Sequence, residues 1–240
     1  MKQTWLVLAA TLAPVCALAD AIDAPSLKPG DTWVYQDTVE KGSNGFVRST
    51  SELSVVRTTA SGIYHTSRPS GSAQPPHELV SGIDWSRIRN INGTETTINK
   101  PLSFPLKTGQ SWNVQYTEQH PNPAHKLEQW SIKYTVMGSE PIEVPAGKFT
   151  AIKIEAEGAW VAEMEPRSTV VQGTQIGENG SATIAQTQHI ANTKATGRAY
   201  KAFWYVPEIK RWVKAVEEYY TADGVRNARY TNELISFKPA

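Results

Sequence analysis

Apolar and polar residues alternate with a period of two along most of the chain. Residues 112–116 read WNVQY, residues 130–136 read WSIKYTV and residues 152–157 read IKIEAE, so each segment has one apolar and one polar phase. Successive side chains of a strand point to opposite faces of a sheet, and the pattern therefore predicts strands with one buried and one solvated face. Beyond residue 19, no window of comparable length has a convincing helical period.

Tight-turn dipeptides separate these runs. Asn or Asp followed by Gly tolerates the positive φ angles of a type I′ turn, which predicts hairpin tips at Asn44-Gly45, Asn92-Gly93, Asn179-Gly180 and Asp223-Gly224. The expected arms are residues 32–40 with 46–57, 83–91 with 94–98, 159–177 with 182–206, and 212–221 with 225–237, and further strands are expected at 111–118, 128–137 and 148–157. The sequence thus predicts an all-β protein, an antiparallel meander of about ten to twelve strands that forms a curved sheet, half barrel or barrel.

Two segments lack strand patterning and are predicted as loops, residues 66–77 and 119–125. The segment 167–197, which is rich in Thr, Gln, Ala and Gly, predicts a long hairpin that protrudes at about residues 160–200; a partly disordered insertion is the alternative. Because no linker interrupts the pattern, we expect residues 20–240 to form a single domain.

One phrase occurs twice, as LKPGDTW at residues 27–33 and as LKTGQSW at residues 106–112. In each copy a Gly is followed by two polar residues and by a Trp that begins an alternating strand. We expect Gly30 and Gly109 to provide positive φ in a turn, and Trp33 and Trp112 to anchor the inward face of the strand. The repeat would then mark two halves of one sheet.

The first 19 residues are typical of a secretory signal peptide. Lys2 precedes an uncharged stretch, residues 5–19, that ends in Ala17-Leu18-Ala19, so cleavage is expected after Ala19 and the protein is expected to be periplasmic or secreted. The stretch is shorter than the roughly 20 residues that a spanning helix needs, and it contains Pro14. We therefore expect a protein that is not integral to the membrane.

Composition excludes several classes of function. The single cysteine, Cys16, lies inside the predicted signal peptide, so the mature chain has no thiol for disulfides, iron–sulfur clusters, zinc thiolates or a cysteine nucleophile. Removing Lys2 from the 24 cationic residues leaves 23, which equals the 23 acidic residues, and this balance does not favour nucleic acid as a partner. No motif indicates a cofactor.

A metal site has one candidate. His120 and His125 flank a Pro-Asn-Pro loop, and Glu118 or Glu128 could complete a ligand set. The irregular spacing favours exposed loop histidines instead, and we predict no metal.

Charged clusters offer no clear catalytic group. Glu155, Glu157, Glu163 and Glu165 could suggest paired acid and base carboxylates, but Glu155 and Glu157 fall on the polar phase of a strand and are expected to be solvated. The cations of the 210–214 region, Lys210, Arg211 and Lys214, are interpreted as turn and outer-face charges. We therefore expect a protein that is not an enzyme.

Aromatic residues are densest between residues 201 and 220. The run Phe203–Val206 is apolar on both phases, so both faces of that strand should be covered, either by core packing or by a ligand. The aromatic residues predicted to line a ligand site are Trp112, Trp130, Trp204, Tyr205 and Trp212.

Three motifs in order carry a resemblance to a known family. They are LKTGQSW, VPAGKFTAIKI at 144–154 and FWYVPEIKRWVKAVEEYY at 203–220, followed by NELISFK at 232–238. This pattern resembles a family of exported bacterial proteins of unknown function with VPAG-x-F and W-Y-x-PE motifs. The resemblance implies a curved antiparallel sheet related to LolA/LolB-like half barrels, which shelter acyl chains, and it supplies no catalytic residues.

These observations predict a non-enzymatic exported protein that binds a lipid or another hydrophobic small molecule, or assists envelope assembly. A carbohydrate- or peptide-binding module is the alternative, in which the same rings would stack on a ligand at the surface. A hydrolase built from scattered Glu and His residues is a third possibility.

Overall fold

The computed structural model of the protein describes residues 21–42, 45–165, 167–176, 182–191 and 193–240. The predicted signal peptide, with its cleavage point after Ala19, and the predicted hairpin tip at Asn179-Gly180 lie outside these residues. In the part of the chain that is described, no helix is long and apolar enough to cross a membrane.

Twelve antiparallel strands form one meandering sheet. They are β1 (Thr32–Lys41), β2 (Phe46–Thr58), β3 (Gly62–Pro69), β4 (His77–Gly82), β5 (Arg87–Ile91), β6 (Thr94–Asn99), β7 (Ser111–Asn122), β8 (His125–Val144), β9 (Gly147–Met164), β12 (Lys194–Val206), β13 (Arg211–Thr221) and β14 (Arg226–Lys238). Strands β10 (Arg167–Ile176) and β11 (Ala182–Ala191) form a separate ladder, and a short 3₁₀ helix, η1 (Pro207–Ile209), precedes β13. The predicted all-β meander is confirmed.

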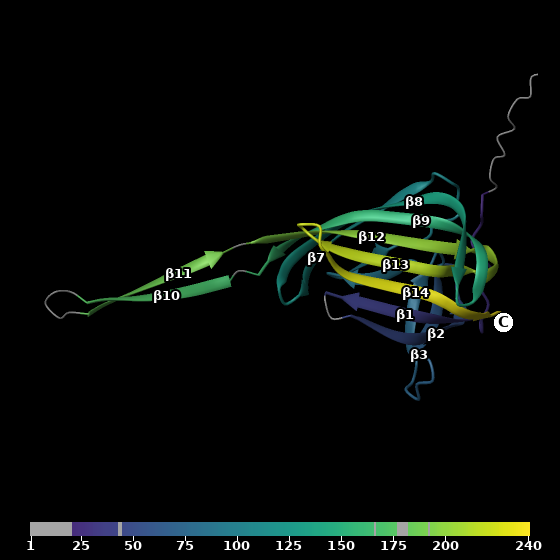
Figure 1. The fold of residues 1–240 in the computed structure, drawn as a ribbon, viewed down its shortest axis with the longest axis horizontal. Coiled ribbons are helices and arrows are strands. Elements are labelled where there is room, and N and C mark those ends of the chain that lie inside the picture. Colours follow the sequence, from purple (N-terminus) through teal and green to yellow (C-terminus); the bar gives the residue numbers. More distant parts are fainter. Residues whose placement is uncertain (1–20, 43–44, 166, 177–181, 192) are drawn as a thin grey trace, which may run out of the picture.

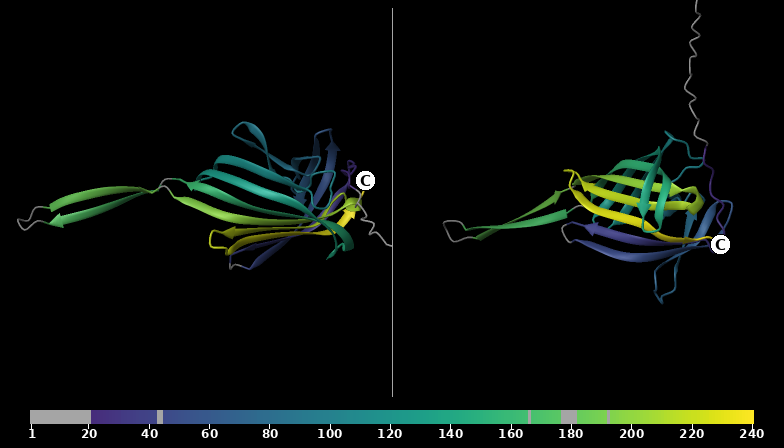
Figure 2. Two further views of the ribbon diagram at one scale, coloured as in Figure 1. Left: turned by 90° about the horizontal axis from the view of Figure 1, so that it is seen from above. Right: turned by 45° about the vertical axis from the view of Figure 1, so that its right-hand side comes forward.

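The sheet curls into a nearly closed barrel (Figure 1). The first and last strands of the sheet in sequence, β1 and β14, pair from Thr32↔Lys238 to Lys41↔Ala228 and so join the two halves of the chain into one sheet. The ladder is interrupted only between β6 and β7, which are the two ends of the strand order. The β10–β11 hairpin extends away from the barrel in each view (Figure 2).

The duplicated phrase forms two matching turns, as the sequence predicts. Gly30 and Gly109 have φ of 97° and 82°. The Gly30 amide donates to the Val55 carbonyl at 2.9 Å, and the Gly109 amide donates to the Val136 carbonyl at 2.8 Å. A residue without a Cβ atom tolerates this left-handed backbone conformation, which explains why glycine occupies both positions.

The match extends to the side chains of the turns. Lys28 donates its amide to Asp31 Oδ2 at 2.8 Å, and Lys107 donates its amide to Gln110 Oε1 at 3.0 Å. Six barrel strands follow each turn, β1–β6 after the first and β7–β9 with β12–β14 after the second. The repeat therefore marks two six-stranded halves, and the β10–β11 hairpin is inserted in the second half.

An aromatic cluster fills the end of the barrel at which β1 and β7 begin, which we call the base. Trp33 is completely buried, stacks on Phe237 at 5.2 Å between ring centroids and meets the edge of Trp85 at 5.5 Å. The indole N–H of Trp33 donates to the Ile209 carbonyl at 2.8 Å, and that of Trp85 donates to the Lys210 carbonyl at 3.2 Å. Buried rings with satisfied donors make this end the rigid part of the fold.

Several predicted boundaries are wrong. The expected loop at 66–77 is shorter, because β3 continues to Pro69 and β4 begins at His77. The expected loop at 119–125 consists largely of strand ends joined by a tight turn, since β7 and β8 pair as far as Asn122↔His125 across an irregular register. The expected arms 159–177 and 182–206 are each divided between two strands, because β9 and β12 belong to the barrel sheet and β10 and β11 pair only with each other.

Candidate functional site

A cavity of about 620 Å³ lies inside the barrel, against the aromatic cluster of the base. Its walls come from both halves of the barrel, with Leu53 and His65 on one side and Phe203 and Trp212 on the other. Trp85 lies between these walls, since its ring centroid is 5.6 Å from that of His65 and 6.3 Å from that of Trp212. We refer to this space as the interior cavity; its volume falls in the range of about 300–1,000 Å³ that is typical of small-molecule sites.

Two smaller hollows adjoin the interior cavity. One of about 280 Å³ shares Ala215, Glu217 and Asn232 with it, and the other, of about 270 Å³, shares Arg87 and is also lined by Trp130. The shared residues show that the three spaces are neighbours within the barrel. The barrel interior is therefore hollow beyond the base and lined by a mixture of rings and charges.

A partly buried ion pair lies between the interior cavity, which Glu217 lines, and the smaller adjoining hollow, which Lys201 lines. Lys201 Nζ is 3.2 Å from Glu217 Oε2, and the exposed fractions of the two side chains are 7% and 28%. Tyr219 donates its hydroxyl to the same carboxylate oxygen at 2.8 Å. Burial raises the pKa of Glu217, but the charge of Lys201 and the hydrogen bonds from Tyr219 and Lys201 outweigh it and hold that pKa below its ordinary value. Glu217 is therefore ionised and paired at neutral pH.

The ion pair belongs to a short hydrogen-bonded chain. Lys201 Nζ also donates to Asn99 Oδ1 at 3.4 Å, and this oxygen accepts the hydroxyl of Tyr134 at 2.6 Å. Asn99 is the last residue of β6, whereas Lys201 and Tyr134 belong to β12 and β8. These contacts connect strands across the interior and fix the position of Lys201.

Arg211 is a half-buried cation of the cavity wall, and it is held differently from Lys201. Its guanidinium lies over the rings of Trp212 at 4.2 Å and Trp85 at 4.5 Å, and 5.3 Å from the ring of Tyr35. Among the described residues it forms no ion pair, and its buried Nε has no hydrogen-bond partner. Burial lowers the pKa of Arg211, although guanidinium remains charged in proteins.

His65 adjoins this cation across Trp85. Its Nε2 is 3.0 Å from Ser81 Oγ, and its Nδ1 is buried without a partner. Burial, with a further contribution from the charge of Arg211, lowers the pKa of His65 to about 4. The imidazole is thus neutral at physiological pH.

The structure does not gather the five predicted ligand-lining aromatics at one site. Trp212 lines the interior cavity and Trp130 lines an adjoining hollow. Trp112 is half-buried in the core and stacks on Tyr134 at 5.5 Å, and Tyr205 is fully buried. Trp204 lies on the opposite phase of its strand, where its indole donates to Glu140 Oε1 at 2.6 Å.

The interpretation of the 210–214 cations needs correction at one position. Lys214 does lie on the outer face, paired with Glu233 at 2.8 Å, and Lys210 pairs with Asp31 at 2.8 Å. Arg211, however, lines the interior cavity together with its neighbour Trp212. Alternation alone could not have placed it there, because the pairing of β12 with β13 shifts at Val213.

Sequence reasoning also missed the Lys201–Glu217 pair. Both residues interrupt an inward-facing row, Lys201 between Ala199 and Phe203, and Glu217 between Ala215 and Tyr219. A charged residue in the apolar phase of a strand was the available signal, since such residues are seldom buried without a partner.

The histidines considered for a metal site each pair with a different carboxylate. His120 Nε2 is 3.2 Å from Glu165 Oε1, and His125 Nδ1 is 2.7 Å from Glu128 Oε2. Across the described ranges, no three or more side chains of the ligand types gather closely enough to hold a metal ion. Glu155 lies on the outer face as predicted, where it pairs with Lys153 at 2.8 Å.

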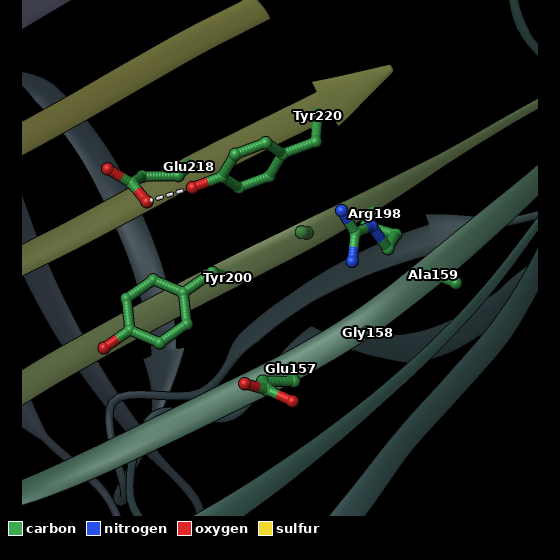
Figure 3. Close-up of a pocket in the computed structure, with 8 residues that line it drawn as sticks. Glu157, Gly158, Ala159, Arg198, Tyr200, Glu218 and Tyr220 are labelled. Carbon is green, nitrogen blue, oxygen red and sulfur yellow. Dashed lines mark hydrogen bonds between the residues drawn. The ribbon is translucent and has the colours of Figure 1, made fainter. Parts of the chain in front are cut away.

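A separate hollow, of about 750 Å³, lies on the outside of β9, β12 and β13 (Figure 3). Small residues form its floor, including Ala159, while Tyr200, Arg198 and Tyr220 stand around it. Tyr220 donates its hydroxyl to Glu218 at 2.6 Å, as Figure 3 shows. This outer groove is open and combines rings with polar groups.

No family model and no curated protein matches the chain. Among solved structures it is similar to an inferred lipoprotein from Parabacteroides distasonis, with 16% identity, coverage of 92% of this chain and 100% of that one, and a TM-score of 0.43. It is also similar to an inferred exported protein with a YmcC-like fold from Bacteroides fragilis, with 13% identity, coverage of 91% and 100%, and a TM-score of 0.42. Likenesses at this level say nothing about a ligand. The family resemblance and the relation to lipoprotein carriers stay predictions.

Proposed function

We propose that the protein is an exported, non-enzymatic binding protein of the cell envelope that holds a small amphipathic molecule in the interior cavity. The observation that carries this proposal is the cavity itself, about 620 Å³ in volume and walled by Trp85, Phe203 and Trp212. Apolar walls with a few polar groups are the usual composition of a small-molecule site. The predicted signal peptide supports an extracytoplasmic location.

The hollow interior also supports binding over a purely structural role. Protein interiors are close-packed, and an unfilled space of this size loses the contacts that would otherwise stabilise the fold. The base of the barrel is tightly packed and its middle is open. This arrangement therefore suits a protein whose base provides stability and whose middle receives a ligand.

A matched pair of variants tests the proposal. Ala215 lines the interior cavity and Ala159 lines the outer groove, so Ala215→Phe fills the first and Ala159→Phe fills the second. Protein purified without detergent from its own envelope is extracted, and mass spectrometry identifies what it releases. We expect wild type and Ala159→Phe to release the same amphipathic compound, and Ala215→Phe to release none while keeping its fold by circular dichroism. A wild-type preparation that releases nothing would remove the support for the proposal.

The outer groove favours a second candidate, a saccharide-binding surface. Aromatic faces beside carboxylates and a guanidinium, as Tyr200, Tyr220, Glu157 and Arg198 provide, can stack on a sugar ring and bond its hydroxyls. Titration with envelope oligosaccharides distinguishes the two: a saccharide whose binding is lost in Ala159→Phe and kept in Ala215→Phe would favour the groove.

A further inference from the structure

Arg211 gives the interior cavity a charge without a protein counterion. Two acidic groups near it are otherwise engaged: Glu217 pairs with Lys201, and Asp37 accepts hydrogen bonds from Ser51 at 2.5 Å and from Asn232 at 2.7 Å. Glu78, the other carboxylate of the cavity wall, is exposed and forms no ion pair with Arg211. Asp37 influences Arg211 through space but forms no ion pair with it within the described residues. A cation enclosed by protein is costly unless a counterion compensates it.

The surroundings of Arg211 leave its guanidinium available on the cavity side. The ring centroids of Trp212 and Trp85 lie 4.2 and 4.5 Å from the guanidinium carbon. No hydrogen bond to a described residue occupies its nitrogens, and the residue lines the cavity while keeping part of its surface accessible. Guanidinium groups bind carboxylates through two parallel hydrogen bonds.

The other residues of the cavity wall indicate the chemistry of the remainder of such a ligand. Leu53, Leu79, Ile88 and Phe203 supply apolar surface within the same cavity. His65, which is neutral and adjacent to Trp85, adds no competing charge. An apolar body with one anionic group would match both the apolar surface and the unpaired guanidinium of Arg211. Arg87, the other arginine of this wall, is exposed and also forms no ion pair among the described residues.

We propose that the ligand of the interior cavity is an amphipathic carboxylate, such as a fatty acid, and that Arg211 binds its carboxylate. This inference rests on the proposed function, because it assigns the chemistry of the molecule that the cavity holds. It assigns Arg211 the role of the specificity-determining residue, while the apolar wall provides affinity for the chain.

Two probes with the same alkyl chain test it at neutral pH. Decanoate carries the anionic head and decanol carries a neutral one, and isothermal titration calorimetry measures the affinity of the full mature chain for each. Hydrogen bonds to a charged group are strong enough for decanoate to bind about 10- to 100-fold more tightly than decanol. In Arg211→Met, whose side chain keeps the apolar stem, we expect decanoate to fall to the affinity of decanol and decanol to stay unchanged.

Arg198→Met is the matched control, since it removes one arginine from the outer groove and leaves the cavity intact. It should keep the full preference for decanoate, and if it loses that preference, net charge and not Arg211 is responsible. Equal binding of the two probes by wild type, or an undiminished preference in Arg211→Met, overturns the inference while leaving the proposed function in place. Failure of wild type to bind either probe counts against both.

A second measurement does not depend on the variant folding. In wild type, decanoate should raise the melting temperature more than decanol at equal concentration, because the tighter ligand stabilises the folded state more. The unliganded Arg211→Met protein should melt at the same or a higher temperature than wild type, since the charge removed has no counterion. Equal shifts by the two probes would contradict the assignment of the carboxylate.

Discussion

Removal of Lys201 should destabilise the protein in a manner that depends on pH. Lys201→Met takes the cation away from Glu217, whose carboxylate is 3.2 Å from Nζ, and leaves that carboxylate on an enclosed wall with Tyr219 as its hydrogen-bond donor. Breaking a buried pair by removing one partner costs about 3–5 kcal/mol. Because Glu217 keeps 28% of its side chain accessible to the cavity, we expect the lower end, about 3 kcal/mol at pH 7.

The sign of the pH dependence follows from the pKa of Glu217. In the folded wild type this pKa lies below its ordinary value of 4.5, so the pair contributes stability above that pH and loses it as the pH falls through the folded-state pKa. Without Lys201, burial is the largest remaining influence, and the pKa of Glu217 moves upward. The difference in unfolding free energy between wild type and variant should therefore be largest at neutral pH and shrink in acid, as Glu217 becomes protonated.

Urea unfolding followed by tryptophan fluorescence measures this difference at several pH values. The matched control is Lys148→Met, which breaks a pair of 3.7 Å to Glu143 whose side chains are 80% and 73% exposed, and which should cost no more than about 0.5 kcal/mol. Adding Glu217→Gln to Lys201→Met should restore much of the lost stability, because the uncompensated charge is then gone. If Lys201→Met costs as little as the control, or if its cost does not change with pH, the pair is not buried as argued.

Three further predictions concern individual residues. Gly158→Ala should destabilise by about 1–3 kcal/mol in urea unfolding, because a Cβ there would lie 2.5 Å from the Ser131 carbonyl; an unchanged midpoint would contradict this packing. Gly30→Ala and Gly109→Ala should each cost about 1–2 kcal/mol, since both have φ near +90°; markedly unequal costs would argue against equivalent turns. His65 should titrate at about 4 by NMR, and because its folded-state pKa lies below its ordinary 6.5, its contribution to stability is lost as the pH falls from about 6.5 towards 4; a pKa near 6.5 would refute its burial.

The sheet could be predicted because its local signals agree with one another. The alternating runs, the Asn-Gly and Asp-Gly tips and the repeated Gly-x-x-Trp phrase each specify a strand or a turn within a few residues. They leave the long-range pairing open, since nothing in β1 alone identifies β14 as its neighbour. β4 was missed because four of its six residues are exposed, which leaves no apolar phase to detect.

The candidate site was harder to predict because aromatic residues serve two purposes in this fold. Tyr205 and Trp212 come from one sequence motif, yet Tyr205 is fully buried in the core and Trp212 lines the cavity. The two residues are cross-strand partners at a register shift between Trp204 and Tyr205, and such bulges cannot be read from composition. Charged residues on the inward phase, Lys201 and Glu217, were the more informative signal.

The repeat places a tryptophan of each half at the same end of the barrel. Both turns place a Trp at the base, where β1 and β7 begin, and the chain between β12 and β13 returns to that end to accept the indole N–H of Trp33. Most of the large buried rings are therefore used for stability at one end. The stability that this packing provides offsets the cost of the paired charge at Lys201 and of the unpaired charge at Arg211, whose guanidinium lies over Trp85 of the base.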